Sequence, residues 1–195
     1  MTIKTLSKPV ARHKNHQRTI TLDGYVREDG LFDIEAELKD TKAYSFPSRA
    51  HGEIKQGEAL HHMHVRVTVC ENFEVKAAEA VTYAGPYHEC PQGAKAIENL
   101  VGKTIQPGWK KIVQRAMGGQ QGCTHITELM GPVATIAFQT IYAEKAKRLR
   151  EADTQANSET APQMSGLLNS CYALSEGRQA AFWNWGIPLS DETTD

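Results

Sequence analysis

The segment Leu31–Lys39 alternates between apolar and charged side chains, and this alternation constrains the fold of the chain. A period of two places all apolar side chains on one face of an extended strand and all charged side chains on the other. The pattern therefore predicts an antiparallel strand with one face buried and one face in solvent. The apolar positions are Phe32, Ile34, Ala36 and Leu38.

Three further segments are expected to complete a sheet of two hairpins. A strand from about Arg18 to Val26 precedes the alternating segment, and the turn-forming residues 27–30 join the two. The second hairpin is predicted from the valine-rich segment 65–70 and the β-compatible segment 73–82, with a turn at Glu71-Asn72. Residues 40–55 contain Pro47 and Gly52, so we expect a loop with a short extended piece.

The pattern becomes helical after Tyr83. Cys90-Pro91 is typical of a helix start, because proline is favoured at the first helical position, and this helix is expected to end near Leu100. A second helix is predicted from Trp109 to Gly118. A long helix then follows Cys123 to about Arg150, with Thr124 as a plausible N-cap. The predicted fold class is α+β, with an antiparallel sheet of N-terminal hairpins packed against C-terminal helices.

This reading divides the chain into four parts. Residues 1–17 are expected to form a mobile leader, residues 18–150 a single domain and residues 151–166 a linker. Residues 167–195 are expected to form an extended segment that docks on the domain. Within it, residues 167–174 and 179–185 are expected to pair as strands, with an apolar anchor of Phe182, Trp183 and Trp185.

Charge and hydropathy exclude several partners. Twenty-two Lys and Arg against 23 Asp and Glu give a net charge of −1, which offers no electrostatic case for nucleic acid or an anionic membrane. No apolar segment approaches the roughly 18 residues that a membrane span requires. The N-terminus lacks the apolar core of a signal peptide, so we expect a cytoplasmic protein. Its four cysteines are then expected as thiols, ligands or a nucleophile. The oligomeric state stays open.

Cysteine and histidine side chains are predicted to meet at one edge of the sheet. The histidine cluster (His61, His62 and His64) precedes the strand expected at Val65, and Cys90 follows the strand expected to end at Thr82. Antiparallel pairing brings these two strand ends together. Cys90 and Cys123 both begin helices, where backbone N–H groups favour a thiolate. We therefore predict that Cys90, Cys123 and one or both of His61 and His62 hold one divalent ion, zinc or iron.

Three kinds of function are compatible with such a site. An open metal position would suit a hydrolase or lyase acting on a small metabolite, with His125 or Glu128 as the general acid or base. A site closed by Cys171 or His64 would suit a metal or iron–sulfur carrier or sensor. The third is metal-free catalysis by a Cys123 thiolate with His125, although side chains two residues apart at a helix start tend to diverge. Alternatively, the segment has only a structural role. A Gly-rich turn then precedes a core helix, and Cys123 is a small buried side chain.

A set of short motifs runs along almost the full length of the chain. The motifs are Gly24-Tyr25, Asp29–Glu35, Asp40-Thr41-Lys42, Cys90-Pro91, Leu100-Val101-Gly102, Gly108-Trp109, Gly118-Gly119, Gly122–His125 and Glu128-Leu129. Through them the chain resembles a bacterial family of proteins, domain of unknown function 2889. The resemblance implies no activity. At the histidine cluster the family pattern is similar to His-Asp-Met, where this chain has His61-His62-Met63.

Residues 60–142 also resemble, more remotely, the iron–sulfur cluster assembly scaffold proteins. The shared order is a strand hairpin, a cysteine at the strand-to-helix junction, short helices and a cysteine that opens a long helix. The resemblance implies a scaffold-like core, with ligands at His61 or His62, at Cys90 and at Cys123. Only two of the three scaffold thiolates are present, and iron–sulfur clusters are held chiefly by thiolates.

Overall fold

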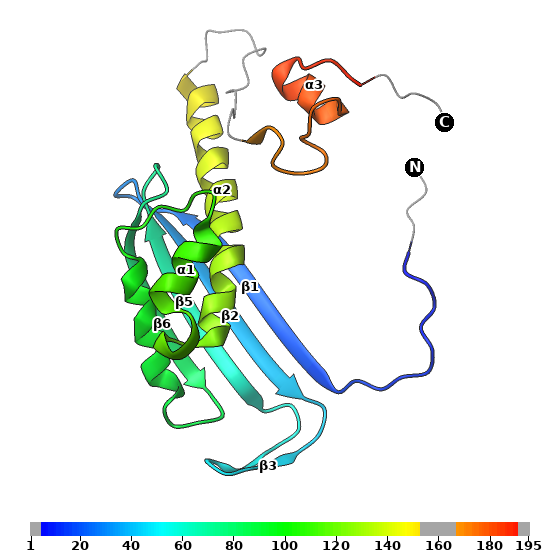
Figure 1. Cartoon of the computed structure of the whole chain (residues 1–195), viewed down its shortest axis with the longest axis vertical. Coiled ribbons are helices and arrows are strands. Elements are labelled where there is room, and N and C mark those ends of the chain that lie inside the picture. The colour runs from blue at the N-terminus through cyan, green and yellow to red at the C-terminus, as the bar shows by residue number, and fades with distance from the viewer. Residues whose placement is uncertain (1–4, 153–166, 191–195) are drawn as a thin grey trace. The chain divides into compact units, whose positions relative to one another are not determined.

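The computed structural model describes residues 5–152 and 167–190 (Figure 1). The chain forms two compact units, residues 1–140 and 141–195, and each is described by itself. The expected single domain of residues 18–150 therefore divides inside its last helix. The predicted leader also ends earlier than expected, because the first strand begins at His16.

The first unit contains a four-stranded antiparallel sheet with the strand order β1-β2-β5-β6. Both predicted hairpins are confirmed. A separate two-stranded sheet, β3-β4, occupies the segment in which a short extended piece was expected. The strands are β1 (His16–Val26), β2 (Phe32–Lys42), β3 (Phe46–Ser48), β4 (Gly52–Ile54), β5 (Ala59–Val69) and β6 (Val75–Ala84).

The two faces of the four-stranded sheet differ as the alternation in β2 predicts. Phe32, Ile34 and Leu38 have no exposed surface, and they face the helices. Asp33, Glu35 and Glu37 lie on the opposite face, which we call the open face; there Arg66 of β5 donates a hydrogen bond to Glu35 at 2.7 Å. Burial of the apolar row against helices stabilises the layer by removing apolar surface from water.

Helices cover one face of the sheet, so the predicted α+β class is confirmed (Figure 1). The indole N–H of Trp109 donates a hydrogen bond to the carbonyl of Met130 at 2.8 Å, which ties α1 to α2. The rings of Phe73 and Phe138 lie 4.4 Å apart and join the sheet to α2. The elements are η1 (Cys90–Leu100), α1 (Trp109–Met117), η2 (Gly119–Gln121) and α2 (Thr124–Ala152).

Two helix predictions need correction in detail. The helix after Cys90-Pro91 is a 3₁₀ helix, with Glu89 at the N-cap position and Cys90 as its first residue. The long helix begins at Thr124, one residue earlier than a Thr124 N-cap would require, so Cys123 directly precedes its first turn. Pro132 lies within this helix.

The second unit differs from the sequence prediction. Residues 179–185 form a short helix, α3 (Gln179–Trp185), and not a strand; Ala181 is its buried residue, and the N–H of Gly186 closes its end on the carbonyl of Phe182. Residues 167–174 form turns. Phe182 and Trp183 are 46% and 74% exposed within the described residues, so they are not a buried anchor there. The predicted linker falls largely in residues 153–166, outside the described ranges. None of the described helices has the length and apolar character of a membrane span.

Candidate metal centre

The histidine cluster lies inside β5, and the prediction that it precedes the strand is wrong. Pairing with β2 extends β5 back to Ala59, with His61 opposite Asp40 and His62 opposite Lys39. Adjacent residues of a strand point to opposite faces. His61 therefore lies on the helix-covered face, whereas the ring of His62 contacts Glu37 on the open face. His64 also lies on the open face, 3.5 Å from Glu35.

Asp40 is the centre of the site. It continues the buried row of β2, and its side chain is 1% exposed. The strand register places Arg18 of β1 directly opposite on one side and His61 of β5 directly opposite on the other. Three residues far apart in the sequence thus form one row across three neighbouring strands.

The closest contacts of the Asp40 carboxylate are with Arg18, His16 and His61, and Arg18 in turn contacts Glu128. Arg18 donates two hydrogen bonds to the Asp40 carboxylate, from Nε to Oδ1 and from Nη2 to Oδ2, both at 2.8 Å. His16 Nε2 lies 3.3 Å from Oδ1, and His61 Nδ1 lies 3.0 Å from Oδ2. Arg18 also donates to Glu128 of α2 at 2.7 Å. A buried carboxylate with this many partners is fixed in one orientation.

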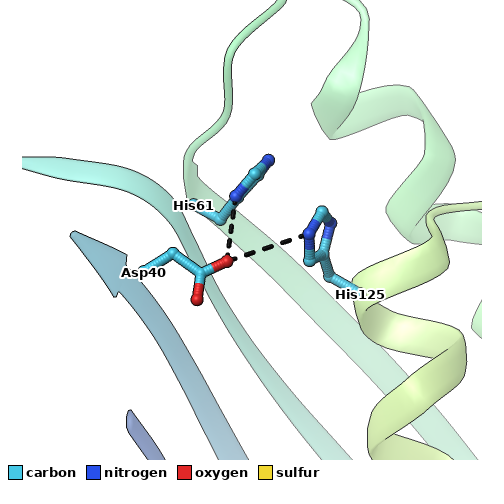
Figure 2. A group of neighbouring side chains, drawn as sticks. All are labelled: Asp40, His61 and His125. Atoms are coloured by element: carbon cyan, nitrogen blue, oxygen red, sulfur yellow. Dashed lines mark hydrogen bonds and ion pairs between the residues drawn. The ribbon is translucent and has the colours of Figure 1, made fainter. Parts of the chain in front are cut away.

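The first turn of α2 brings a second imidazole to the same carboxylate oxygen. The His125 ring lies 3.8 Å from the His61 ring, and its Nε2 atom is 3.9 Å from Asp40 Oδ2 (Figure 2). One ligand atom from each of Asp40, His61 and His125 lies within 4.8 Å of the other two. Among the described residues, these are the three side chains that lie close enough together to hold a metal ion.

The protonation of the group suits a cation. Burial would raise the pKa of Asp40, but the hydrogen bonds and charge of Arg18 outweigh it and lower the pKa to about 2. The same pairing raises the pKa of Arg18. Burial, together with the neighbouring His125, lowers the pKa of His61. At neutral pH the site therefore presents an ionised carboxylate beside a neutral imidazole.

Cys123 lies at the start of α2 beside this group. Burial would raise the pKa of its thiol, but hydrogen bonds from His125 and from the backbone N–H groups of Ile126 and His125 lower it overall. Its Sγ atom is 3.9 Å from His125 Nδ1. The backbone N–H of Cys123 donates to the carbonyl of Gly93 at 3.2 Å. A Cβ atom at Gly93 would lie 3.1 Å from that nitrogen, so glycine allows η1 to approach the helix start.

A cavity of about 410 Å³ opens beside the two imidazoles. It brings together three of the four predicted ligands, because His61, Cys90 and Cys123 all line it together with His125. His62 does not line it. Neither cysteine belongs to the group of three ligand atoms found among the described residues. Glu128 is paired with Arg18, and Cys171 is an exposed residue of the second unit. The rest of the lining is Met63, Pro86, Tyr87, Glu89, Gly93, Gly122 and Thr124.

Sequence reasoning missed Asp40, Arg18 and His16 as site residues. The signal for Asp40 was present, because the buried positions Phe32, Ile34, Ala36 and Leu38 continue with the same period to residue 40. A charged residue at a buried position requires a partner, and such a position is a candidate site. Arg18 and His16 could be found only after the register of β1 and β2 was known.

The fold and the site together describe an α+β protein with an Asp/His group beside a cavity. A family model, "Protein of unknown function (DUF2889)", matches residues 16–139, and the chain belongs to this family. No curated protein and no solved structure matches the chain. The likeness to iron–sulfur scaffold proteins therefore stays a prediction.

Proposed function

We propose that the protein binds one divalent metal ion through Asp40 Oδ2, His61 Nδ1 and His125 Nε2. The convergence of these three atoms from β2, β5 and α2 supports the proposal (Figure 2). Two imidazoles and one carboxylate are a common donor set for zinc and for non-haem iron. Ligands about 2.1 Å from a metal lie roughly 3.0–3.4 Å from one another. Asp40 Oδ2 lies 3.0 Å from His61 and 3.9 Å from His125, and the three ligand atoms lie within 4.8 Å of one another, so the group would contract on binding an ion.

The charge of the group favours a cation. The positive charge of Arg18 is opposed by the carboxylates of Asp40 and Glu128, so these three groups carry one net negative charge. A divalent ion bound at Asp40 would offset that charge. Arg18 and His16 would then act on the far side of Asp40 and hold its ligating oxygen in place.

The adjoining cavity gives this function its chemistry. His61 and His125 belong to the proposed metal site and also line the cavity. A bound ion would therefore have open positions towards a small molecule in the cavity. A metal in such a position activates water or polarises a carbonyl group. We therefore infer a metal-dependent hydrolase or lyase that acts on a small cytoplasmic metabolite. His125 becomes a ligand in this scheme, and Glu128 a residue that positions Arg18. A non-catalytic metal carrier is the alternative for the same site.

One observation favours a second candidate function. Cys123 Sγ, His125 and Asp40 form a chain of contacts, with 3.9 Å between Sγ and Nδ1 and 3.9 Å between Nε2 and Oδ2. This is the order of nucleophile, base and orienting carboxylate in thiol-dependent catalysis. His125 cannot serve both schemes at once. In the metal scheme its Nε2 atom binds the ion, whereas in thiol-dependent catalysis the same Nε2 atom carries a proton that it donates to Asp40. In the metal scheme, the Nδ1–H of His125 donates to Cys123, which fixes the ring.

Metal analysis of folded variants tests the proposal and separates the two schemes. Wild-type protein should bind zinc or iron near one equivalent, and His61→Ala and Asp40→Asn should lose it. His62→Ala is the matched control, because the adjacent imidazole lies on the open face and should not be needed. Cys123→Ser should keep the metal. Folded wild-type protein that binds neither ion would refute the metal scheme, and loss of metal in Cys123→Ser would instead favour a cysteine ligand.

A further inference from the structure

The edge strand β1 lacks several of the features that usually prevent one sheet from pairing with another, and the cation on its helix-covered face, Arg18, is neutralised by Asp40 and Glu128. All of its residues except Leu22 are exposed, and β2 is its pairing partner among the described strands. Natural edge strands are commonly protected by proline, by lysine or by a bulge. Residues 16–26 contain neither proline nor lysine, and the register between β1 and β2 has no shift. An unprotected edge of this length is a template for another strand.

The opposite edge of the sheet is different. The N–H of Val75, at the start of β6, donates to the carbonyl of Lys103, and its carbonyl accepts from Gly102, both at 2.8 Å. The register between β5 and β6 also has two shifts. These features cover one end of the β6 edge and bend the strand, so among the described residues β1 is the edge that is more open to pairing.

The sequence of β1 is complementary to itself. Full-length antiparallel pairing of two copies of residues 16–26 places Thr21 on the two-fold axis and Ile20 opposite Leu22 on the helix side. Ile20 and Val26 are 39% and 47% exposed in one copy, and pairing would cover apolar surface of this kind. Arg18 would lie opposite Gly24, and Asp23 opposite Thr19, so no two like charges face each other. Opposed threonines and opposed aliphatic side chains both stabilise antiparallel pairs.

We propose that the protein is a homodimer in which two β1 strands pair antiparallel and join the two sheets into one. The occupant of the open edge is thus a second copy of this chain. The proposal does not depend on the metal scheme, but it has a consequence for the site. β1 carries His16 and Arg18, which hold Asp40, and a strand bonded on both sides fluctuates less than a free edge.

A cysteine cross-link tests the register of the pairing and captures a weak dimer as well as a tight one. In the proposed pairing the two residues at position 21 lie directly opposite, with Cβ atoms about 5 Å apart. The two residues at position 19 are displaced by four residues along the strand, or roughly 13 Å. Mild oxidation of Thr21→Cys should therefore give a disulfide-linked dimer joined at position 21, and Thr19→Cys should not. Cys171→Ser is included in both proteins, because Cys171 is exposed.

A charge change tests the same pairing without oxidation. Thr21→Lys would face Glu37 within its own chain, which favours folding, but would place two lysines together on the two-fold axis. Light scattering should show at least about tenfold weaker association of this variant than of wild type. A mixture of Thr21→Lys with Thr21→Glu should restore a dimer. Val81→Lys, on the same face but on β6, should associate like wild type.

Several outcomes would overturn the proposal. Wild-type protein that light scattering finds monomeric over a series of protein concentrations has no such dimer. Equal cross-linking at positions 19 and 21 would show collision of chains and not a fixed register. A dimer that Thr21→Lys and Val81→Lys weaken equally, or that neither weakens, must form through another surface.

Discussion

Replacement of Asp40 by asparagine should destabilise the metal-free protein in a pH-dependent way. The substitution keeps the shape of the side chain but removes the charge that Arg18 binds through two hydrogen bonds. It also leaves Arg18 with Glu128 as its remaining carboxylate partner among the described contacts. A buried pair that loses one partner leaves the other charge poorly compensated.

The magnitude follows from the pKa of Asp40. The folded protein lowers this pKa from 3.8 to about 2, and one pKa unit corresponds to about 1.4 kcal/mol, so the ionised carboxylate contributes about 2 kcal/mol of stability. Because the pKa is lowered, this contribution is complete above the unfolded value near 3.8 and is lost as the pH falls towards 2. Asp40→Asn should therefore lower the free energy of unfolding by about 2 kcal/mol at pH 7, and the difference should narrow below pH 4.

Urea denaturation monitored by the fluorescence of Trp109 measures this difference. Trp109 is buried in the first unit, and the other two tryptophans, Trp183 and Trp185, are replaced by phenylalanine in every protein compared. Asp29→Asn is the matched control, since Asp29 also pairs with an arginine but lies exposed in a turn and should matter little. Equal stability of Asp40→Asn and wild type at pH 7, or a gap that persists at pH 2, would refute the reasoning.

Three further predictions concern the start of α2 and its surroundings. Cys123 should react with a small alkylating reagent at pH 7 faster than Cys70, because the pKa of its thiol is lowered; mass spectrometry of folded protein measures both rates, and equal rates would contradict this assignment. Gly93→Ala should lower the melting temperature, because its Cβ would lie 3.1 Å from the Cys123 nitrogen and separate η1 from α2. Gly131→Ala, within α2 and with no atom beyond its chain neighbours near its Cβ, should lower the melting temperature less than Gly93→Ala, because only the following Pro132 opposes a Cβ there; calorimetry of the two variants measures both shifts.

The fold was predictable from the sequence to the extent that single segments carried a clear period. The alternation of residues 31–39 defined β2 and its buried face, and glycine and proline marked the starts and ends of η1 and α1. Residues 179–185 contain three aromatic side chains but lack such a period, and they form a helix where a strand was expected. Aromatic side chains favour strands only on average, and local context decides short segments.

The site was harder to predict because it depends on register. His61, Cys90 and Cys123 do line one cavity, as topology suggested. His61 and His62 lie on opposite faces of the sheet, however, because both belong to β5 and adjacent side chains of a strand point in opposite directions. Asp40 becomes a partner of Arg18 and His61 only through pairings between distant strands, and no spacing within one segment records those pairings.

The row of Arg18, Asp40 and His61 also makes the site a measure of correct assembly. A slip of one residue between β1 and β2, or between β2 and β5, would turn one member of the row to the opposite face of the sheet. No fragment with a single hairpin contains all three side chains in position. Under the metal proposal, affinity should therefore appear only when β2, β5 and the first turn of α2, which carry the three ligands, have assembled in register, at the end of folding and not during it. Metal binding by this chain would therefore report that its strands have paired in the correct register.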